Sequence, residues 1–127
     1  MLYSILIYGS EERVAAWTAQ EEQEVMARHT ELRQQLKAAR RLGPVLRLKP
    51  NEAKTVRKYR ERRFITDGPF AESKEQLMGI YVVDCATFED AAAAAERLTF
   101  ETGVFEIRPV IWLDPGEVPA HIPPQQE

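Results

Sequence analysis

The sequence predicts an α+β domain in which two helices cover one face of a mainly antiparallel sheet. Strand-forming runs stand near both ends of the chain, two helical stretches alternate with strands, and residues 76–84 form an apolar run bounded by polar residues. With 127 residues, the chain has the length of one domain and can bury a core without help from a disulfide or a metal.

A strand and a long helix are predicted in the first third of the chain. Residues 2–8 are rich in strand formers and are apolar on both faces, which is typical of a central strand. Thr18 and Glu21 have the spacing of a capping box at a helix start. An apolar stripe then recurs at helical spacing: Val25, His29, Leu32, Leu36 and Ala39. We expect this helix to end at Leu42-Gly43-Pro44.

The rest of the chain predicts more strands and a second helix. Strands are expected at residues 45–48, Lys54–Tyr59, residues 63–66, Gln76–Asp84 and residues 104–113, and a helix capped by Thr87 at Phe88–Leu98. Residues 60–62 would form the turn of a hairpin. Residues 114–127 are rich in proline, so we expect one domain at residues 1–113 followed by an extended tail.

This order, with a hairpin inserted in its middle, matches the split βαββαβ pattern of ferredoxin-like proteins. Both helices would lie on one face of the sheet, and the other face would carry Glu106 and Arg108 among apolar residues. A partly apolar face of this kind is seldom left exposed, and the simplest cover for it is a second copy of the chain. We therefore expect a homodimer.

Composition and charge narrow the classes of partner. The net charge of −3 argues against a dedicated nucleic-acid or membrane binder, although residues 54–63 carry six basic side chains and one acidic one. We interpret that run as a solvated hairpin, because Tyr59 is its single aromatic residue. No apolar stretch reaches the ~20 residues of a membrane span. The N-terminal run lacks the basic segment of a secretory signal, and the lone Cys85 fits a reducing compartment, so we expect a cytoplasmic protein.

Several kinds of catalytic site are missing from the sequence. No two glycines form a G-x-G pair that would cradle a phosphate. Two histidines, His29 and His121, and Cys85 do not have the spacing of a metal cluster. We therefore expect neither a cofactor nor a metal.

His29 and Asp67 are the candidate catalytic residues. His29 stands in the apolar stripe of the first helix, where the pattern predicts leucine or alanine, so it is either an acid/base group or a hydrogen-bonded core histidine. Asp67 opens the sequence Asp-Gly-Pro-Phe, where it either orients a histidine or caps the turn. Burial of an imidazole without a partner would cost about 1–3 kcal/mol, so we expect His29 to have a hydrogen-bond acceptor.

Four more residues are candidates for ligand binding. Glu106 and Arg108 point the same way from one strand, so they either bind an anion, with Arg108 as a forked donor, or pair with each other, with solvent or across a dimer interface. Phe70 would be an apolar anchor after the turn, and Tyr81 and Arg108 would line the same cavity as His29.

Three blocks of the sequence resemble one family. Residues 66–81 (TDGPFAESKEQLMGIY), residues 6–9 (LIYG) and residues 106–110 (EIRPV) are similar to the DGPF group within the YCII-related family of small bacterial proteins. The resemblance implies a dimeric α+β barrel, in which two ferredoxin-like units face each other across their open sheets. In related proteins a His–Asp pair in a pocket suggests enzymatic activity, and one branch resembles a dehydrochlorinase. By this resemblance His29 corresponds to the histidine, and Asp67 is the candidate for the aspartate.

Two functions of different classes follow. The first is a cofactor-free enzyme that moves a proton on a small anionic or aromatic molecule, in an isomerisation, elimination or hydrolysis. The second is a non-catalytic ligand-binding or accessory module linked to transcription regulation, since some DGPF proteins resemble companions of extracytoplasmic-function sigma factors.

Overall fold

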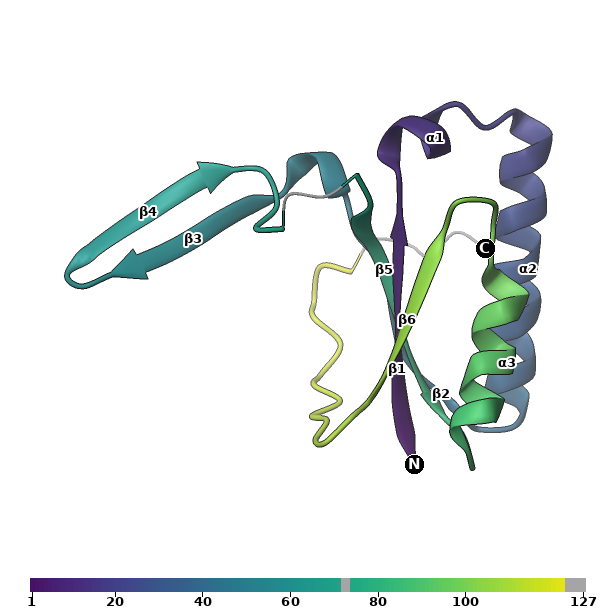
Figure 1. Ribbon diagram of the computed structural model, residues 1–127. Helices are drawn as coiled ribbons and strands as arrows, with labels where there is room; N and C mark the ends of the chain where they lie inside the picture. The colour runs from purple at the N-terminus through teal and green to yellow at the C-terminus, as the bar shows by residue number, and fades with distance from the viewer. Residues whose placement is uncertain (72–73, 123–127) are drawn as a thin grey trace.

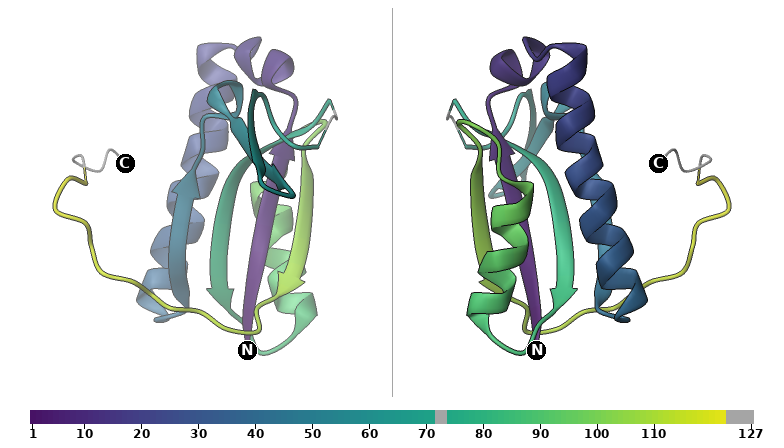
Figure 2. Two further views of the ribbon diagram at one scale, coloured as in Figure 1. Left: turned by 90° about the vertical axis from the view of Figure 1, so that its left-hand side faces the viewer. Right: turned by 90° about the vertical axis from the view of Figure 1, so that its right-hand side faces the viewer.

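The main sheet of the protein has four strands in the order β2-β5-β1-β6. A computed structural model describes residues 1–71 and 74–122. The strands are β1 (Leu2–Gly9), β2 (Leu42–Arg47), β5 (Gln76–Asp84) and β6 (Val104–Pro109), and each neighbouring pair is antiparallel. Helices α2 (Ala19–Ala38) and α3 (Phe88–Leu98) lie together on one face of this sheet, as the two views in Figure 2 show. The predicted α+β architecture with a mainly antiparallel sheet is confirmed.

The start of α2 is the predicted capping box. Thr18 Oγ1 accepts a hydrogen bond from the Glu21 N–H at 3.1 Å, and Glu21 Oε1 accepts one from the Thr18 N–H at 3.1 Å. Two N–H groups that the first turn of a helix leaves free are thereby satisfied.

The end of α2 comes earlier than predicted. Arg40 takes a left-handed conformation with φ of 59°, and the Arg41 N–H donates to the Leu36 carbonyl at 2.8 Å. This closing pattern normally uses glycine, so an arginine in its place hides the helix end from sequence analysis. Gly43 lies in β2 instead, where a Cβ atom would come 2.9 Å from the carbonyl oxygen of Val82 on β5.

A short helix, α1 (Glu11–Ala15), stands between β1 and α2 and was not predicted. Ser10 caps it, and Ser10 Oγ accepts a hydrogen bond from the Arg13 N–H at 3.4 Å. Five residues are too few to show an apolar period, which is why the sequence pattern misses this helix.

The core lies between the sheet and helices α2 and α3. Alternate residues of β1 point into it, and the alanines of α3 place small side chains against the strands. Its buried members are Tyr3, Ile5, Ile7, Leu32, Tyr81, Val83, Cys85, Ala91, Ala94, Ala95 and Leu98. Tyr81 therefore points to the side of the sheet that α2 covers.

A hairpin arm, made of β3 (Lys54–Tyr59) and β4 (Arg62–Asp67), projects from the body on the side away from α2 and α3 (Figure 1). It follows the short 3₁₀ turn η1 (Pro50–Glu52) and pairs only with itself among the described strands. Its turn is tighter than predicted, because Arg60 takes a φ of 56° and lets Arg62 pair with Tyr59.

The last strand is shorter than predicted and ends at Pro109. The Val110 N–H still donates to the Leu2 carbonyl at 2.9 Å, but Ile111 and Trp112 are exposed. Residues 123–127 of the predicted tail, and residues 72–73 of the family-like segment, lie outside the described residues. Within the described part of the chain, no helix is both long and apolar enough to cross a bilayer.

Candidate functional site

A cavity of about 140 Å³ lies between α2 and the sheet, and we call it the His29 cavity. Its polar lining consists of His29 and Arg33 from α2, Arg47 from β2 and Tyr81 from β5. The apolar lining is formed by Ile7, Val14, Trp17, Val25, Met26, Val45, Leu46, Met78, Gly79 and Phe100. An apolar cavity of about 150 Å³ holds benzene, so this space suits a molecule with the size of one small ring.

A hydrogen bond joins the two groups of the cavity that can exchange a proton. His29 Nδ1 lies 2.7 Å from the hydroxyl oxygen of Tyr81. The helix positions His29 on the face of α2 that looks at the sheet, and Tyr81 points to the same space because it pairs with Ile5 in the central strand. The hydrogen-bond partner of the partly buried imidazole is therefore a phenol.

The contact with Arg33 indicates which of His29 and Tyr81 is the hydrogen-bond donor. The Arg33 Nη1 donates to the Tyr81 oxygen at 3.5 Å, so that oxygen already accepts one hydrogen bond from the guanidinium. The hydroxyl of Tyr81 has no other hydrogen-bond acceptor than His29 among the described residues. We therefore assign Tyr81 as the donor and Nδ1 as the acceptor, which leaves the ring proton of a neutral His29 on Nε2. With this assignment His29 accepts the hydrogen bond, whereas an acceptor was predicted as its partner from the sequence.

Burial and positive charge keep His29 neutral. Burial is the largest cause, and the charges of Arg33, Arg28 and Arg47 add to it, so that the pKa of His29 falls from 6.5 to about 4. Burial also raises the pKa of Tyr81, although the hydrogen bond and the charge of Arg33 act in the opposite direction. At neutral pH the pair is an uncharged imidazole and an uncharged phenol.

The charged lining of the His29 cavity is entirely positive among the described residues. Arg33 and Arg47 contribute two guanidinium groups, and no aspartate or glutamate lines the cavity. The Arg33 Nη2 donates to Thr30 Oγ1 at 3.4 Å, and the Arg47 Nη1 lies 4.0 Å from Met26 Sδ. Neither arginine has an ion-pair partner in residues 1–71 and 74–122.

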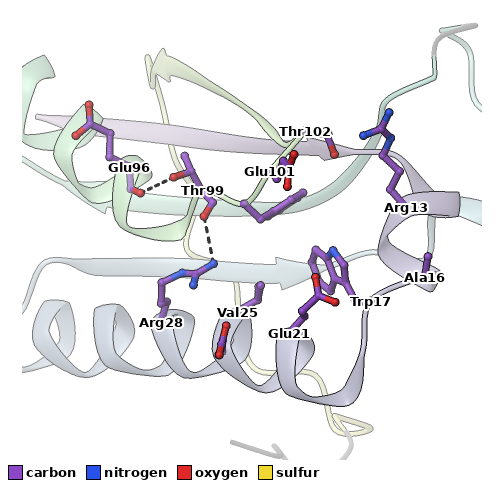
Figure 3. Close-up of a pocket in the computed structure, with 12 residues that line it drawn as sticks. Arg13, Ala16, Trp17, Glu21, Val25, Arg28, Glu96, Thr99, Glu101 and Thr102 are labelled. Atoms are coloured by element: carbon purple, nitrogen blue, oxygen red, sulfur yellow. Dashed lines mark hydrogen bonds between the residues drawn. The ribbon is translucent and has the colours of Figure 1, made fainter.

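A second, more open hollow of about 680 Å³ lies beside α1 and the N-terminal half of α2 (Figure 3). In this hollow the guanidinium of Arg28 donates to the Thr99 carbonyl at 3.2 Å. The lining also includes Glu21, Glu96 and Glu101. Its described lining includes no histidine, tyrosine or cysteine. We therefore take the His29 cavity, and not this hollow, as the candidate site.

The structure brings His29 and Tyr81 together in the His29 cavity, whereas Asp67 and Phe70 do not line it. Asp67 is exposed at the base of the hairpin arm, where it stands opposite Lys54. Phe70 is 75% exposed, and the guanidinium carbon of Arg57 lies 5.6 Å from its ring centroid. Among the described residues no hydrogen bond connects Asp67 with His29, so their pairing stays a prediction.

Glu106 and Arg108 lie on the sheet face opposite the His29 cavity. Arg108 Nε donates to Glu106 Oε1 at 2.8 Å, which is the mutual pairing that was one of the alternatives open for these residues. The Glu106 carboxylate raises the pKa of Arg108. In this chain neither side chain lines the His29 cavity.

Arg33 and Arg47 are the site residues that sequence analysis missed. Arg33 follows His29 by four residues, so the two share a face of α2, and this spacing was available in the sequence. No sequence pattern indicated Arg47, because Arg47 lies near α2 only through the packing of β2 against that helix. Among the described residues, no group of three or more His, Cys, Asp or Glu side chains is placed to hold a metal ion.

The fold and this cavity define a small α+β protein with a polar pocket between one helix and an antiparallel sheet. The model of the YCII-related domain matches residues 1–114, and the chain belongs to that family. An uncharacterised protein of Rhizobium meliloti (strain 1021) is 40% identical over 124 residues, which cover 94% of this chain and 100% of the relative.

Proposed function

We propose that the protein is a cofactor-free enzyme that moves a proton on a small organic molecule bound in the His29 cavity. The observation that carries this proposal is the 2.7 Å hydrogen bond between a neutral imidazole and a phenol in the wall of a cavity of about 140 Å³. A purely structural histidine would need the hydrogen bond but not the space beside it.

The geometry supports a relay through Tyr81. The Tyr81 oxygen would accept a proton from the substrate while the Tyr81 hydroxyl proton passes to His29 Nδ1. His29 would then hold the extra proton as an imidazolium, and return of that proton to another atom of the substrate would complete an isomerisation. An elimination begins with the same step, whereas in a hydrolysis the Tyr81 oxygen would accept the proton of the attacking water. The relay needs only acid and base groups, so it requires no cofactor.

Exchange of hydrogen for deuterium tests the relay across a panel of candidate substrates. The protein would be incubated in D₂O with a library of small carbonyl and carboxylate compounds, and loss of C–H signals would be followed by proton NMR. We expect exchange in at least one compound, and a fall of at least tenfold in both His29→Gln and Tyr81→Phe. The matched control is Arg41→Gln, an exposed arginine outside the His29 cavity, which should exchange normally. Exchange that is unchanged in His29→Gln would show the proposal to be wrong.

The aspartate prediction has its own variant in the same assay. If Asp67 orients His29, as the family resemblance implies, Asp67→Asn should lower the exchange rate without unfolding the protein. Because Asp67 stands in the projecting arm of this chain, such an effect would have to come through a second copy or a movement of the arm. An unchanged rate in Asp67→Asn would remove Asp67 from the site and leave Tyr81 as the partner of His29.

The alternative function, a non-catalytic binding or accessory module, makes the opposite prediction in this assay. A compound would then bind in the His29 cavity, with shifts of cavity signals, while no C–H position exchanges.

We also propose that the protein is a homodimer that joins through its uncovered sheet face and the hairpin arm. A row across all four strands, Leu46, Ile80, Leu6 and Glu106, lies on this face, and Leu46 is 52% exposed. In the arm Val56 and Ile65 pair with each other and are 64% and 58% exposed.

Two physical arguments support this assembly. An isolated two-stranded hairpin is only marginally stable in water, and an apolar sheet face seldom remains bare. The arm also projects on the same side as the uncovered face, so one partner can cover both (Figure 1). Light scattering at micromolar concentration should give twice the chain mass of 14.6 kDa. The mass of a single chain would contradict the proposal.

A further inference from the structure

Arg33 and Arg47 line the His29 cavity without an ion-pair partner in the described part of the chain, a feature that proton transfer alone does not explain. Both arginines line the cavity, and Arg33 is partly buried whereas Arg47 is exposed. A guanidinium that is partly removed from water is stabilised by an anionic partner, and the described lining offers none. A negatively charged ligand could therefore act as the anionic partner of these two arginines.

We propose that Arg33 and Arg47 hold the carboxylate of a small organic acid whose apolar part fills the His29 cavity. This inference names the substrate class for the proposed function and rests on it only in using the same cavity. Arginine is suited to this task because its planar donors match the two oxygens of a carboxylate. The remaining lining is apolar apart from His29 and Tyr81, so the rest of the ligand would be a hydrocarbon ring or short chain.

The size of the cavity limits the ligand further. A volume of about 140 Å³ leaves room for one six-membered ring or a branched chain, and not for a nucleotide or a fatty acid. The carboxylate would lie near the mouth, where Arg47 is exposed, and the body of the acid would lie against Trp17, Phe100 and Tyr81.

A bound carboxylate would also change the basicity of His29. The charged groups that face its ring are Arg28 and Arg33 on α2 and Arg47 on β2, and on β5 it faces the titratable Tyr81. All three arginines disfavour an imidazolium. An anion between Arg33 and Arg47 offsets part of that charge, so the ligand itself would make His29 a stronger base for the proposed relay.

The test compares acids with their neutral counterparts. Acetate, butyrate, cyclohexanecarboxylate and benzoate would be titrated into ¹⁵N-labelled protein, each beside its primary amide, which has nearly the same shape and no charge. We expect at least one acid to bind at least tenfold more tightly than its amide and to shift backbone signals around His29 and Tyr81. Arg33→Gln and Arg47→Gln should each weaken binding of that acid about tenfold or more, as loss of a charge-assisted hydrogen bond does.

Arg41→Gln is the matched control, because Arg41 is an exposed arginine after α2 that does not line the His29 cavity. It should bind the acid as the unchanged protein does. The inference is wrong if no acid binds more tightly than its amide, or if Arg33→Gln and Arg47→Gln bind normally although their spectra show a folded protein. It is also wrong if Arg41→Gln is the variant that loses binding. These failures would leave the dependence of deuterium exchange on His29 intact, so they are distinct from failure of the proposed function.

Discussion

Replacement of His29 with glutamine should make the stability of this protein less sensitive to acid. In the folded protein the pKa of His29 is lowered from 6.5 to about 4, whereas in the unfolded chain the ring returns to its ordinary behaviour. Between these two values the unfolded state binds more protons than the folded state, so acid favours unfolding. The stability that the neutral imidazole contributes is complete above pH ~6.5 and is lost as the pH falls through about 4.

The magnitude follows from the same two pKa values. At about pH 7 the unfolded ring is mostly neutral, and the linkage contributes only a few tenths of a kcal/mol. At about pH 5 the unfolded ring is mostly protonated while the folded ring is mostly neutral, which lowers the free energy of unfolding by about 2 kcal/mol. Glutamine does not titrate, and its amide can still bond to the Tyr81 hydroxyl. The variant should therefore lack this loss, whatever its stability at neutral pH.

Urea denaturation of both proteins at about pH 7 and about pH 5, at one fixed protein concentration, measures the effect. Carboxylates also titrate in this interval, but they do so in both proteins and cancel in the difference. With a slope of about 1–3 kcal/mol per molar urea, the wild-type midpoint should fall by about 1 M more than that of His29→Gln. His121→Gln is the control, because His121 is exposed near the C-terminus and its replacement should preserve the wild-type behaviour. Parallel loss of stability in His29→Gln and wild type would refute the argument that burial keeps His29 neutral.

Four shorter predictions test the fold and the partner classes. Thr18→Ala should lower the free energy of unfolding by about 0.5–2 kcal/mol and Thr18→Ser by much less, since only alanine removes the capping hydroxyl. Leu32→Ala should cost about 2–5 kcal/mol, because Leu32 is 2% exposed, and a loss below about 1 kcal/mol would mean that the core is not packed as described. Gly43→Ala should cost about 1–3 kcal/mol through the clash with the Val82 carbonyl, and unchanged urea midpoints would contradict that contact. Despite the basic arm, fluorescence anisotropy at about 150 mM salt should detect no submicromolar binding of oligonucleotides, because the chain as a whole is acidic.

The elements of the fold that depend on local chemistry were predictable from the sequence. Gln76–Asp84 and Phe88–Leu98 were predicted with the boundaries that the structure has, and the capping box at Thr18 was identified from two residues. The predictions failed where a segment departs from the usual sequence preferences of helix ends or is too short to show a pattern. Arg40 replaces the usual glycine after α2, and the five residues of α1 are too short for a pattern.

The candidate site was predictable only in part. His29 was recognisable because a polar ring interrupts an apolar helical stripe, and Tyr81 was expected to line the same cavity. Their hydrogen bond, in contrast, joins residues that are 52 positions apart, and no local preference specifies such a distance.

By itself, the sequence determined most of the strands and helices along the chain, without α1, and the presence of a titratable ring in the apolar stripe of α2. These properties follow from period, capping and turn chemistry, which act over a few residues. Only the tertiary structure decided that the ring meets Tyr81, that Arg33 and Arg47 surround it without a lining carboxylate in the described residues, and that the arm bearing Asp67 projects away from it. These properties depend on how β2, β5 and α2 pack, because burial and electrostatic fields arise from groups that are close in space and distant along the chain.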